Sequence, residues 1–240
     1  MVEHAFDFDP WGVEQVVDPA GVPVPVGEGP DKTMAYVADA AVPRAAVVVV
    51  HDWYGHLPHL REQCDALAAA GMTALAPDLY DGHLTGDEGE AARLFQDLDL
   101  ARAHRRLLLC VAHLRERGAE RVGLLGFSTG GYLALRLAGS AQVQAVVAYY
   151  AALVGPERAP IGCPVQLHFA EYDHWESADI PDGFVEWLAE CGTPTEVYRY
   201  PGARHGFANR TVGVYRPGSA ELAWARTTRF LGSHLVWRPP

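Results

Sequence analysis

Short apolar runs alternate with amphipathic stretches along most of this chain, and that alternation restricts it to an α/β fold. Strand-length apolar runs lie at 34–39, 45–50, 72–76, 121–125, 143–149, 164–170 and 195–200. Helical patterns separate them at 58–70, 88–117, 130–139, 182–191 and 219–234. Strands that alternate with helices form a mostly parallel, doubly wound sheet with helices on both faces. The runs at 45–50 and 143–149 are apolar at almost every position, as expected of strands covered on both sides.

Residues 1–33 differ from the rest of the chain. They are rich in Gly, Pro and Asp, and the section PAGVPVPVGEGP is dense in turn-forming residues. We predict an irregular arm with one or two short edge strands, packed on the domain. Residues 34–240 contain no internal repeat, linker or low-complexity block, so we predict one domain of ordinary size there.

The charge balance limits the possible partners. The chain has 19 Lys and Arg against 30 Asp and Glu, which gives a net charge of −11. Such an acidic chain gains nothing from phosphate backbones or anionic lipids, so we expect a small-molecule partner and neither nucleic acid nor a membrane. The longest apolar run, AAVVVV, is too short to span a bilayer. The composition does not specify the oligomeric state, and we expect a monomer or a homodimer.

Two features predict a cytoplasmic location. The first ten residues, MVEHAFDFDP, carry acids and a proline where a signal peptide has a basic start and an apolar core. The four cysteines are widely spaced and form no CxxC pair: Cys64, Cys110, Cys163 and Cys191. We expect all four to be free, buried thiols in a reducing compartment.

The stretch GFSTG, residues 126–130, matches the pattern G-x-S-x-G between a predicted strand and a predicted helix. In a nucleophile elbow of this pattern, the serine occupies a tight turn and the flanking glycines remove side chains that would collide. An ordinary glycine-rich turn with a surface serine is the alternative. The strand before, the helix after, and an acid and a histidine beyond later strands favour the elbow.

A serine hydroxyl needs a base, and polar residues at the ends of later strands supply one. His205 lies in a loop after the last strong strand, and Asp173 follows the preceding strand. In chain order, Ser128, Asp173 and His205 match the catalytic triad of the α/β-hydrolase architecture. Rival acids are Glu171 and Asp179. Rival bases are His174 and His168, although His168 falls inside a strand, where a core histidine is expected.

An oxyanion hole requires two backbone N–H groups near the nucleophile. One should come from Thr129, directly after Ser128. The other should come from the loop after the strand at 45–50, where we place it on Trp53.

These motifs together resemble those of the dienelactone hydrolase family, in order, across roughly residues 30–235. The segments that carry the resemblance are HDWYG (51–55), APDLYDG (76–82), GFSTGG (126–131), AEYDHW (170–175) and PGARHGFAN (201–209). The resemblance implies a compact α/β-hydrolase without a large cap domain that cleaves esters or lactones without a cofactor. In the family's H-E-x-x-G loop, Asp52 takes the place of a glutamate that contacts the nucleophile, and Trp53 that of the residue lending an oxyanion N–H.

The chain departs from the family pattern at its nucleophile and in its expected substrate clamp. The best-known members carry cysteine where this chain has Ser128, so its chemistry depends fully on the histidine base. Members that act on dienelactone hold the substrate carboxylate with two arginines. The first follows the D-L-Y segment, where this chain has Asp81-Gly82. The second lies four residues after the histidine, where this chain has Asn209, with Arg210 one position later. We therefore expect uncharged esters to be better substrates than anionic dienelactones.

We assign further residues near the strand ends to the substrate pocket, with an aromatic character suited to an uncharged acyl or ring group. They are Asp52, Tyr54, Tyr80, Asp81, Phe127, Trp175, Phe207 and Asn209. The histidines at 51, 56 and 59 fit no familiar zinc spacing, so we predict no metal site. The arginines at 102, 105 and 106 should form a solvated helix face.

The sequence therefore predicts a cofactor-independent serine hydrolase of carboxylic esters or lactones. The same triad would serve an acyltransferase or a lactone-forming cyclase if an alcohol replaced water. A non-catalytic ligand-binding protein could also keep this fold, although binding alone requires no triad.

Overall fold

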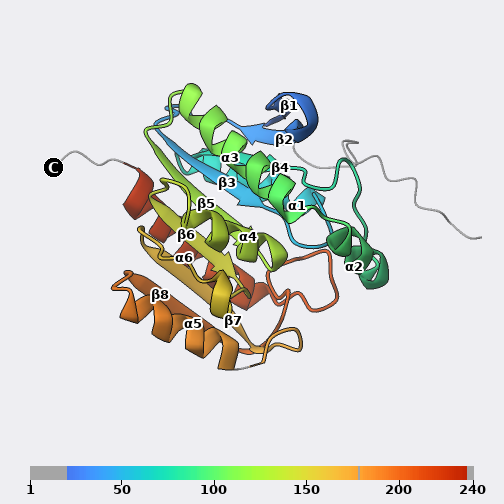
Figure 1. Cartoon of the computed structure of the whole chain (residues 1–240), viewed down its shortest axis with the longest axis vertical. Helices are drawn as coiled ribbons and strands as arrows, with labels where there is room; N and C mark the ends of the chain where they lie inside the picture. The colour runs from blue at the N-terminus through green and yellow to red at the C-terminus, as the bar shows by residue number, and fades with distance from the viewer. Residues whose placement is uncertain (1–20, 178, 237–240) are drawn as a thin grey trace, which may run out of the picture.

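The computed structural model describes residues 21–177 and 179–236 and contains one eight-stranded sheet in the order β1-β2-β4-β3-β5-β6-β7-β8 (Figure 1). The strands are β1 (Val22–Val26), β2 (Thr33–Ala38), β3 (Ala45–Val50), β4 (Thr73–Pro77), β5 (Arg121–Phe127), β6 (Ala145–Tyr149), β7 (Val165–Tyr172) and β8 (Thr195–Arg204). The helices are α1 (Pro58–Ala69), α2 (Glu88–Gln96), α3 (Leu100–Glu116), α4 (Thr129–Ala138), α5 (Asp179–Glu190) and α6 (Pro217–Leu235).

The sheet is parallel from β4 through β8 and antiparallel at the other edge. β1 pairs with β2, and β2 with β4, in antiparallel registers. In the part of the arm that the structure describes, Val22–Val26 forms an edge strand of the same sheet, of the kind predicted for this arm. The rest of the arm, residues 1–20, lies outside the described residues.

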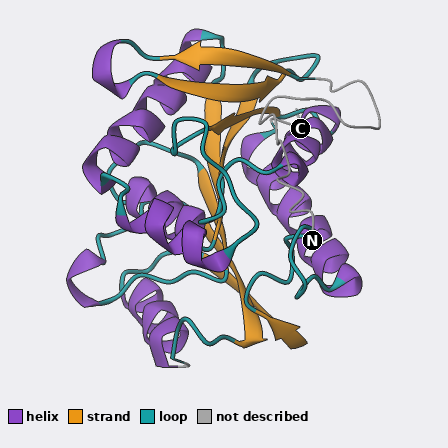
Figure 2. Ribbon diagram, turned by 90° about the vertical axis from the view of Figure 1, so that its right-hand side faces the viewer, coloured by secondary structure: helices purple, strands orange, loops and turns teal. Residues whose placement is uncertain are grey.

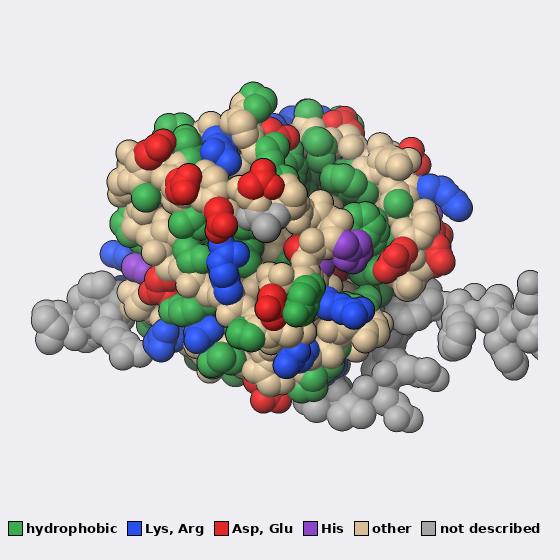
Figure 3. All heavy atoms as spheres, turned by 90° about the horizontal axis from the view of Figure 1, so that it is seen from below, with side chains coloured by type: hydrophobic (Ala, Val, Ile, Leu, Met, Phe, Trp, Pro, Cys, Tyr) green, Lys and Arg blue, Asp and Glu red, His purple; other side chains and the backbone are tan. Residues whose placement is uncertain are grey.

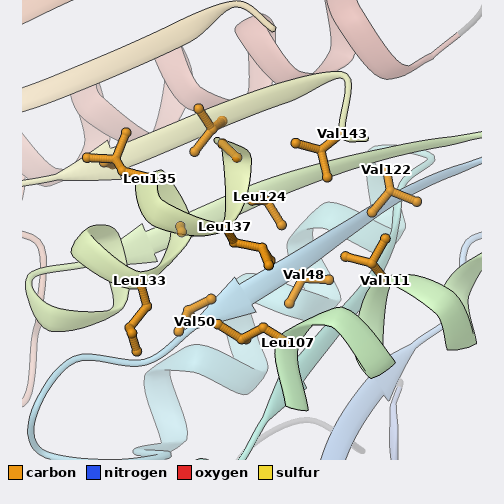
Figure 4. Close-up of a cluster of buried hydrophobic side chains, with 14 of the residues drawn as sticks. Val48, Val50, Leu107, Val111, Val122, Leu124, Leu133, Leu135, Leu137 and Val143 are labelled. Atoms are coloured by element: carbon orange, nitrogen blue, oxygen red, sulfur yellow. The ribbon is translucent and has the colours of Figure 1, made fainter. Parts of the chain in front are cut away.

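Helices cover both faces of the sheet, which confirms the predicted doubly wound α/β-hydrolase fold (Figure 2). One core layer joins α3, α4 and α5 to the sheet, and the other joins α1 and α6 to its opposite face. Figure 4 shows the first layer, where Val48 of β3 and Leu124 of β5 lie against Leu107 of α3 and Leu137 of α4. Successive strand residues point into opposite layers, because side chains alternate across a strand. The purely apolar composition of β3 follows from this arrangement.

The predicted helix at 88–117 is wrong as a single element, because the structure divides it into α2 and α3. Asp87 caps α2 by accepting from the Glu90 N–H at 2.8 Å, and Asp99 caps α3 by accepting from the Arg102 N–H at 3.0 Å. A capping side chain starts a new helix at its own position. The Asp99 cap therefore favours the start of α3 over a continuation of α2. The break lets α2 lie apart from α3, at the carboxyl ends of the central strands (Figure 1).

Three of the four cysteines are buried, as expected, but Cys191 is exposed, because it follows the last residue of α5 at the surface. No helix among the described residues is long and apolar enough to cross a membrane. On the face that Figure 3 shows, acidic and basic side chains are interspersed with hydrophobic ones.

Candidate active site

Ser128 lies at the turn from β5 into α4, in a backbone conformation that L-residues rarely adopt. Its φ is 51° and its ψ is −118°. A Cβ on Gly126 would lie well inside 3.0 Å of the Gly130 backbone, and one on Gly130 would meet the Val50 and His51 carbonyl oxygens equally closely. The two glycines are therefore required by backbone contact on both sides of the serine.

Ser128, His205 and Asp173 are joined by two short hydrogen bonds. The Ser128 Oγ lies 2.8 Å from the His205 Nε2, and the His205 Nδ1 lies 2.7 Å from the Asp173 Oδ2. The side chains of His205 and Asp173 are only 12% and 14% exposed. The histidine can thus accept a proton from the serine while its other nitrogen is held by the carboxylate.

The pairing of β7 with β8 places the acid beside the base. Asp173 follows β7 and His205 follows β8, and the His205 N–H donates to the Tyr172 carbonyl at 3.1 Å. Asp173 Oδ1 also accepts from the backbone N–H groups of Trp175 and Glu176 at 2.9 and 3.2 Å. Burial opposes ionisation of this carboxyl, but the hydrogen bond and charge of His205 outweigh it and lower the pKa of Asp173.

The rival residues lie outside this hydrogen-bonded chain. Glu171 accepts from the Gly202 N–H, and Asp179 is exposed at the start of α5. His168 is fully buried between Tyr200 and Gln166, where burial lowers its pKa to about 3. His174 is exposed, and its ring lies 4.7 Å from that of Trp175 in a tilted arrangement.

Two cavities meet at Ser128. The larger, of about 480 Å³, is lined by Trp53, Ala92, Phe95, Gln96, Leu100, Ser128, Thr129, Tyr132, Tyr150, Ala151, Glu157, Trp175, Glu176 and His205. The smaller, of about 90 Å³, is lined by Asp52, Trp53, Tyr54, Glu88, Ser128, Tyr150, His174, Trp175, His205, Gly206, Asn209, Val212, Gly213 and Val214. Neither lining contains Lys or Arg among the residues described.

The predicted oxyanion residues both line the larger cavity beside the serine. Thr129 is the first residue of α4, where a helix N–H has no partner within the helix. Trp53 follows β3, and its ring meets that of Trp175 edge-on at 4.7 Å. The two indoles form one wall where the cavities join.

Asp52 is a buried carboxylate at the smaller cavity. Its Oδ1 accepts from the Tyr54 N–H at 2.9 Å and its Oδ2 from the Asn209 Nδ2 at 2.8 Å. Burial raises the pKa of Asp52 to about 6, although both hydrogen bonds favour the ionised form. Asn209 therefore binds a carboxylate of the protein.

The structure does not place four of the predicted pocket residues at these cavities. Tyr80 and Asp81 line a separate cavity next to α3, where Asp81 pairs with the buried guanidinium of Arg106. Phe127 and Phe207 are buried in the core behind the elbow. Phe127 ends β5, and its side chain joins the core layer of α1 and α6, because successive strand residues face opposite sides.

The prediction that the arginines at 102, 105 and 106 form a solvated helix face is wrong for Arg106. Arg106 is 1% exposed rather than solvated, and it donates to the carbonyls of Leu79 and Lys32 as well as to Asp81. Arg102 and Arg105 do form exposed ion pairs.

Several lining residues escaped the sequence analysis. Ala92, Phe95 and Gln96 come from α2, Glu157 ends the short 3-10 helix Gly155–Glu157, and Glu176 comes from a loop. Only the position of Glu176, three residues after Asp173, could have drawn attention to it. No cluster of metal-binding side chains occurs within residues 21–177 and 179–236.

The sequence and the fold are both similar to those of known hydrolases. The sequence model of the dienelactone hydrolase family matches residues 32–235, which is most of the chain. This chain belongs to the dienelactone hydrolase family. It is accordingly an enzyme of the class that hydrolyses lactones and esters.

Relatives within the dienelactone hydrolase family match most of this chain. A putative carboxymethylenebutenolidase of Azospirillum brasilense is 31% identical and covers 89% of this chain and 98% of its own. The carboxymethylenebutenolidase of Rhodococcus opacus is 29% identical, over 79% of this chain and 81% of its own. The structure of a putative dienelactone hydrolase from Klebsiella pneumoniae has a TM-score of 0.79 at 24% identity, covering 88% and 98% of the two chains. Each of these matches spans at least 79% of this chain and 81% of the relative.

Proposed function

We propose that this protein is a cofactor-independent serine hydrolase that cleaves uncharged carboxylic esters or lactones through an acyl-enzyme. The observation that carries the proposal is the chain of hydrogen bonds from Ser128 through His205 to Asp173, at 2.8 and 2.7 Å. Such a chain prepares a hydroxyl for attack at neutral pH, which a lone serine cannot do.

The reaction starts with attack of the Ser128 Oγ on the substrate carbonyl carbon while its proton moves to the His205 Nε2. The carbonyl oxygen becomes an oxyanion, which the backbone N–H groups of Trp53 and Thr129 stabilise. His205 then gives the proton to the leaving alkoxide, and Asp173 stabilises the imidazolium throughout. A water molecule, deprotonated by the same histidine, hydrolyses the acyl-enzyme and restores Ser128.

The preference for an uncharged substrate rests on the cavity linings. The relatives named carboxymethylenebutenolidase act on a lactone that bears a carboxylate, as their name states. In this chain Asp81 is paired with Arg106 and Asn209 with Asp52, and no Lys or Arg lines either described cavity. An anionic substrate would therefore lose its hydration without gaining a cationic partner.

The first test is hydrolysis of p-nitrophenyl acetate by the wild type and by Ser128→Ala, with labelling by a fluorophosphonate probe. We expect turnover and labelling at Ser128 in the wild type, and background rates in the variant. Equal rates for the two folded proteins, or no labelling of the wild type, would contradict the proposal.

The cytoplasmic location and the monomeric or homodimeric state predicted from the sequence remain part of this proposal. The free thiols Cys64, Cys110 and Cys163 support the first. Cell fractionation and light scattering on the purified protein measure the two properties.

A further inference from the structure

The two cavities that meet at Ser128 differ about fivefold in volume, at about 480 Å³ and about 90 Å³. Water takes about 30 Å³ per molecule in the liquid, and a methylene group is of similar size. The larger cavity therefore accommodates about sixteen such groups and the smaller about three. An ester that fills both cavities has one long arm and one short arm.

The wall of the larger cavity suits an apolar chain. Ala92 and Phe95 line it from α2, and Leu100 lines it from the start of α3. Glu157, one of the two acids in this lining, already accepts a hydrogen bond from the Tyr132 hydroxyl at 2.7 Å. A methylene chain laid against the apolar side chains leaves water and gains contact with them.

The smaller cavity has a more polar wall. Its lining includes the carboxyl groups of Asp52 and Glu88, the amide of Asn209 and the imidazole of His174. A long alkyl chain placed there would remove water from these groups without supplying hydrogen bonds in return. An alcohol group of one to three carbons fits the volume, so the smaller cavity suits the short arm of an ester.

The position of the histidine base decides which arm enters which cavity. In the proposed reaction His205 gives its proton to the leaving oxygen, so the alcohol arm lies against the histidine and the segment after it. Gly206, Asn209 and Val212 of that segment line the smaller cavity but not the larger. Thr129, whose N–H is assigned to the oxyanion, lines the larger cavity but not the smaller. The acyl arm, on the other side of the carbonyl carbon, then extends into the larger cavity.

We propose that the larger cavity is an acyl-chain site, and that the preferred substrates are esters of a long apolar acid with a short alcohol. This inference rests on the proposed function and narrows its substrate class. The volume sets the acyl length at about six to twelve carbons. Ala92, Phe95 and Leu100 determine the specificity for the acyl chain, and Val212 that for the alcohol.

Two isomeric esters test the direction of binding. Ethyl octanoate and octyl acetate contain the same atoms, but the long arm belongs to the acid in the first and to the alcohol in the second. Each methylene removed from water is worth up to about fourfold in kcat/KM. We therefore expect kcat/KM, from titration of the released acid, to be at least about tenfold higher for ethyl octanoate. Equal values, or a preference for octyl acetate, would overturn the inference.

Two variants locate the acyl preference. Ala92→Phe narrows the larger cavity, so it should lower the ratio of kcat/KM for ethyl octanoate to that for ethyl butanoate about tenfold. Val212→Phe narrows the smaller cavity, so it should leave that ratio unchanged and instead lower the ratio for propyl octanoate to methyl octanoate. An unchanged acyl ratio in Ala92→Phe, or an equal change in Val212→Phe, contradicts the assignment of the acyl chain to the larger cavity.

Ala189→Phe supplies the matched control for the added ring. Ala189 is exposed on α5 and belongs to neither lining, so both ratios should equal those of the wild type. A lowered acyl ratio in this variant would mean that the effect of Ala92→Phe is not local, which overturns the acyl-chain site.

p-Nitrophenyl acetate and Ser128→Ala separate this inference from the proposed function. A wild type that hydrolyses p-nitrophenyl acetate through Ser128 but shows no preference for ethyl octanoate refutes the acyl-chain site alone. A folded Ser128→Ala protein that hydrolyses ethyl octanoate as fast as the wild type refutes the serine mechanism, and the orientation argued from His205 fails with it.

Discussion

The contact of Gly130 with strand β3 supports a quantitative prediction about the elbow. A Cβ at this position would lie well inside 3.0 Å of the Val50 and His51 carbonyl oxygens. These are backbone atoms at the carboxyl end of strand β3, so they cannot move aside as the end of a flexible side chain could. In Gly130→Ala, helix α4 must shift away from β3.

The free-energy cost of that shift can be estimated from substitutions that insert extra methyl groups into the cores of other proteins. Extra methyl groups in tight cores cost about 1–3 kcal/mol, and a contact with rigid backbone belongs at the upper end. In a chain of this size, about 3 kcal/mol lowers Tm by roughly 6–12 °C. A movement of about 1 Å at Ser128 would lower kcat by about a hundredfold, because its 2.8 Å hydrogen bond to His205 would be broken.

Gly232 supplies the matched control. It lies inside helix α6, and a Cβ there would meet nothing within 4 Å. Gly232→Ala should therefore stabilise the protein by up to about 1 kcal/mol, since alanine is the better helix former. Its kcat should equal that of the wild type.

Thermal unfolding and hydrolysis of p-nitrophenyl acetate, measured on both variants, check this reasoning. A Gly130→Ala protein as stable and active as the wild type would refute the argument that backbone contact dictates glycine at the elbow. So would equal losses in the two variants.

Three further predictions concern charged groups. Asp173→Asn should lower kcat for p-nitrophenyl acetate by about 10³–10⁴-fold, because an amide cannot hold the required His tautomer; Asp179→Asn, which alters the exposed rival acid, should leave kcat unchanged. Burial raises the pKa of Asp52 in the folded protein to about 6, from an ordinary value of 3.8. As pH rises from 4 to 7, the wild type should therefore lose up to about 3 kcal/mol of unfolding free energy relative to Asp52→Asn. Parallel curves of unfolding free energy against pH, from denaturant titration of the two proteins, would contradict this. Arg106→Leu should destabilise the protein by about 2–4 kcal/mol in urea unfolding, because three acceptors lose a buried donor. Arg105→Ala, which breaks an exposed pair, should have little effect, and similar losses in the two arginine variants would contradict the assignment of Arg106 to the interior.

The elements of the fold could be predicted because their signals are local. Strands such as β3 show as apolar runs, and the helices between them show as amphipathic stretches, so the sheet and its two covering layers follow. The division at 97–99 was missed because the helical periodicity continues across it, and only the cap at Asp99 marks the break.

The candidate triad could be proposed for a different reason. In a parallel sheet the carboxyl ends of strands meet at one edge, so Ser128, Asp173 and His205 were expected to converge from their places after strands. The fold places them in order, with one strand, β6, between the strand of the serine and that of the acid.

Membership of the pocket could not be predicted from such local patterns. Tyr80 and Asp81 follow a strand as the triad residues do, yet Asp81 pairs with Arg106, which lies far along the chain on α3. Glu176 lines the cavity because two hydrogen bonds fix its position. Its backbone N–H donates to the Asp173 carboxylate, and its side chain accepts from the Ala152 N–H.

The sequence by itself determined most strands and helices, the tight turn at Ser128 and the candidate acid and base, because periodicity and turn chemistry act over a few residues. Only the tertiary structure decided which side chains face the substrate and which carboxylates are already paired. That decision depends on contacts between residues distant in the chain, such as Asn209 with Asp52 and Arg106 with Asp81, whose energies come from burial and charge rather than from neighbours in sequence.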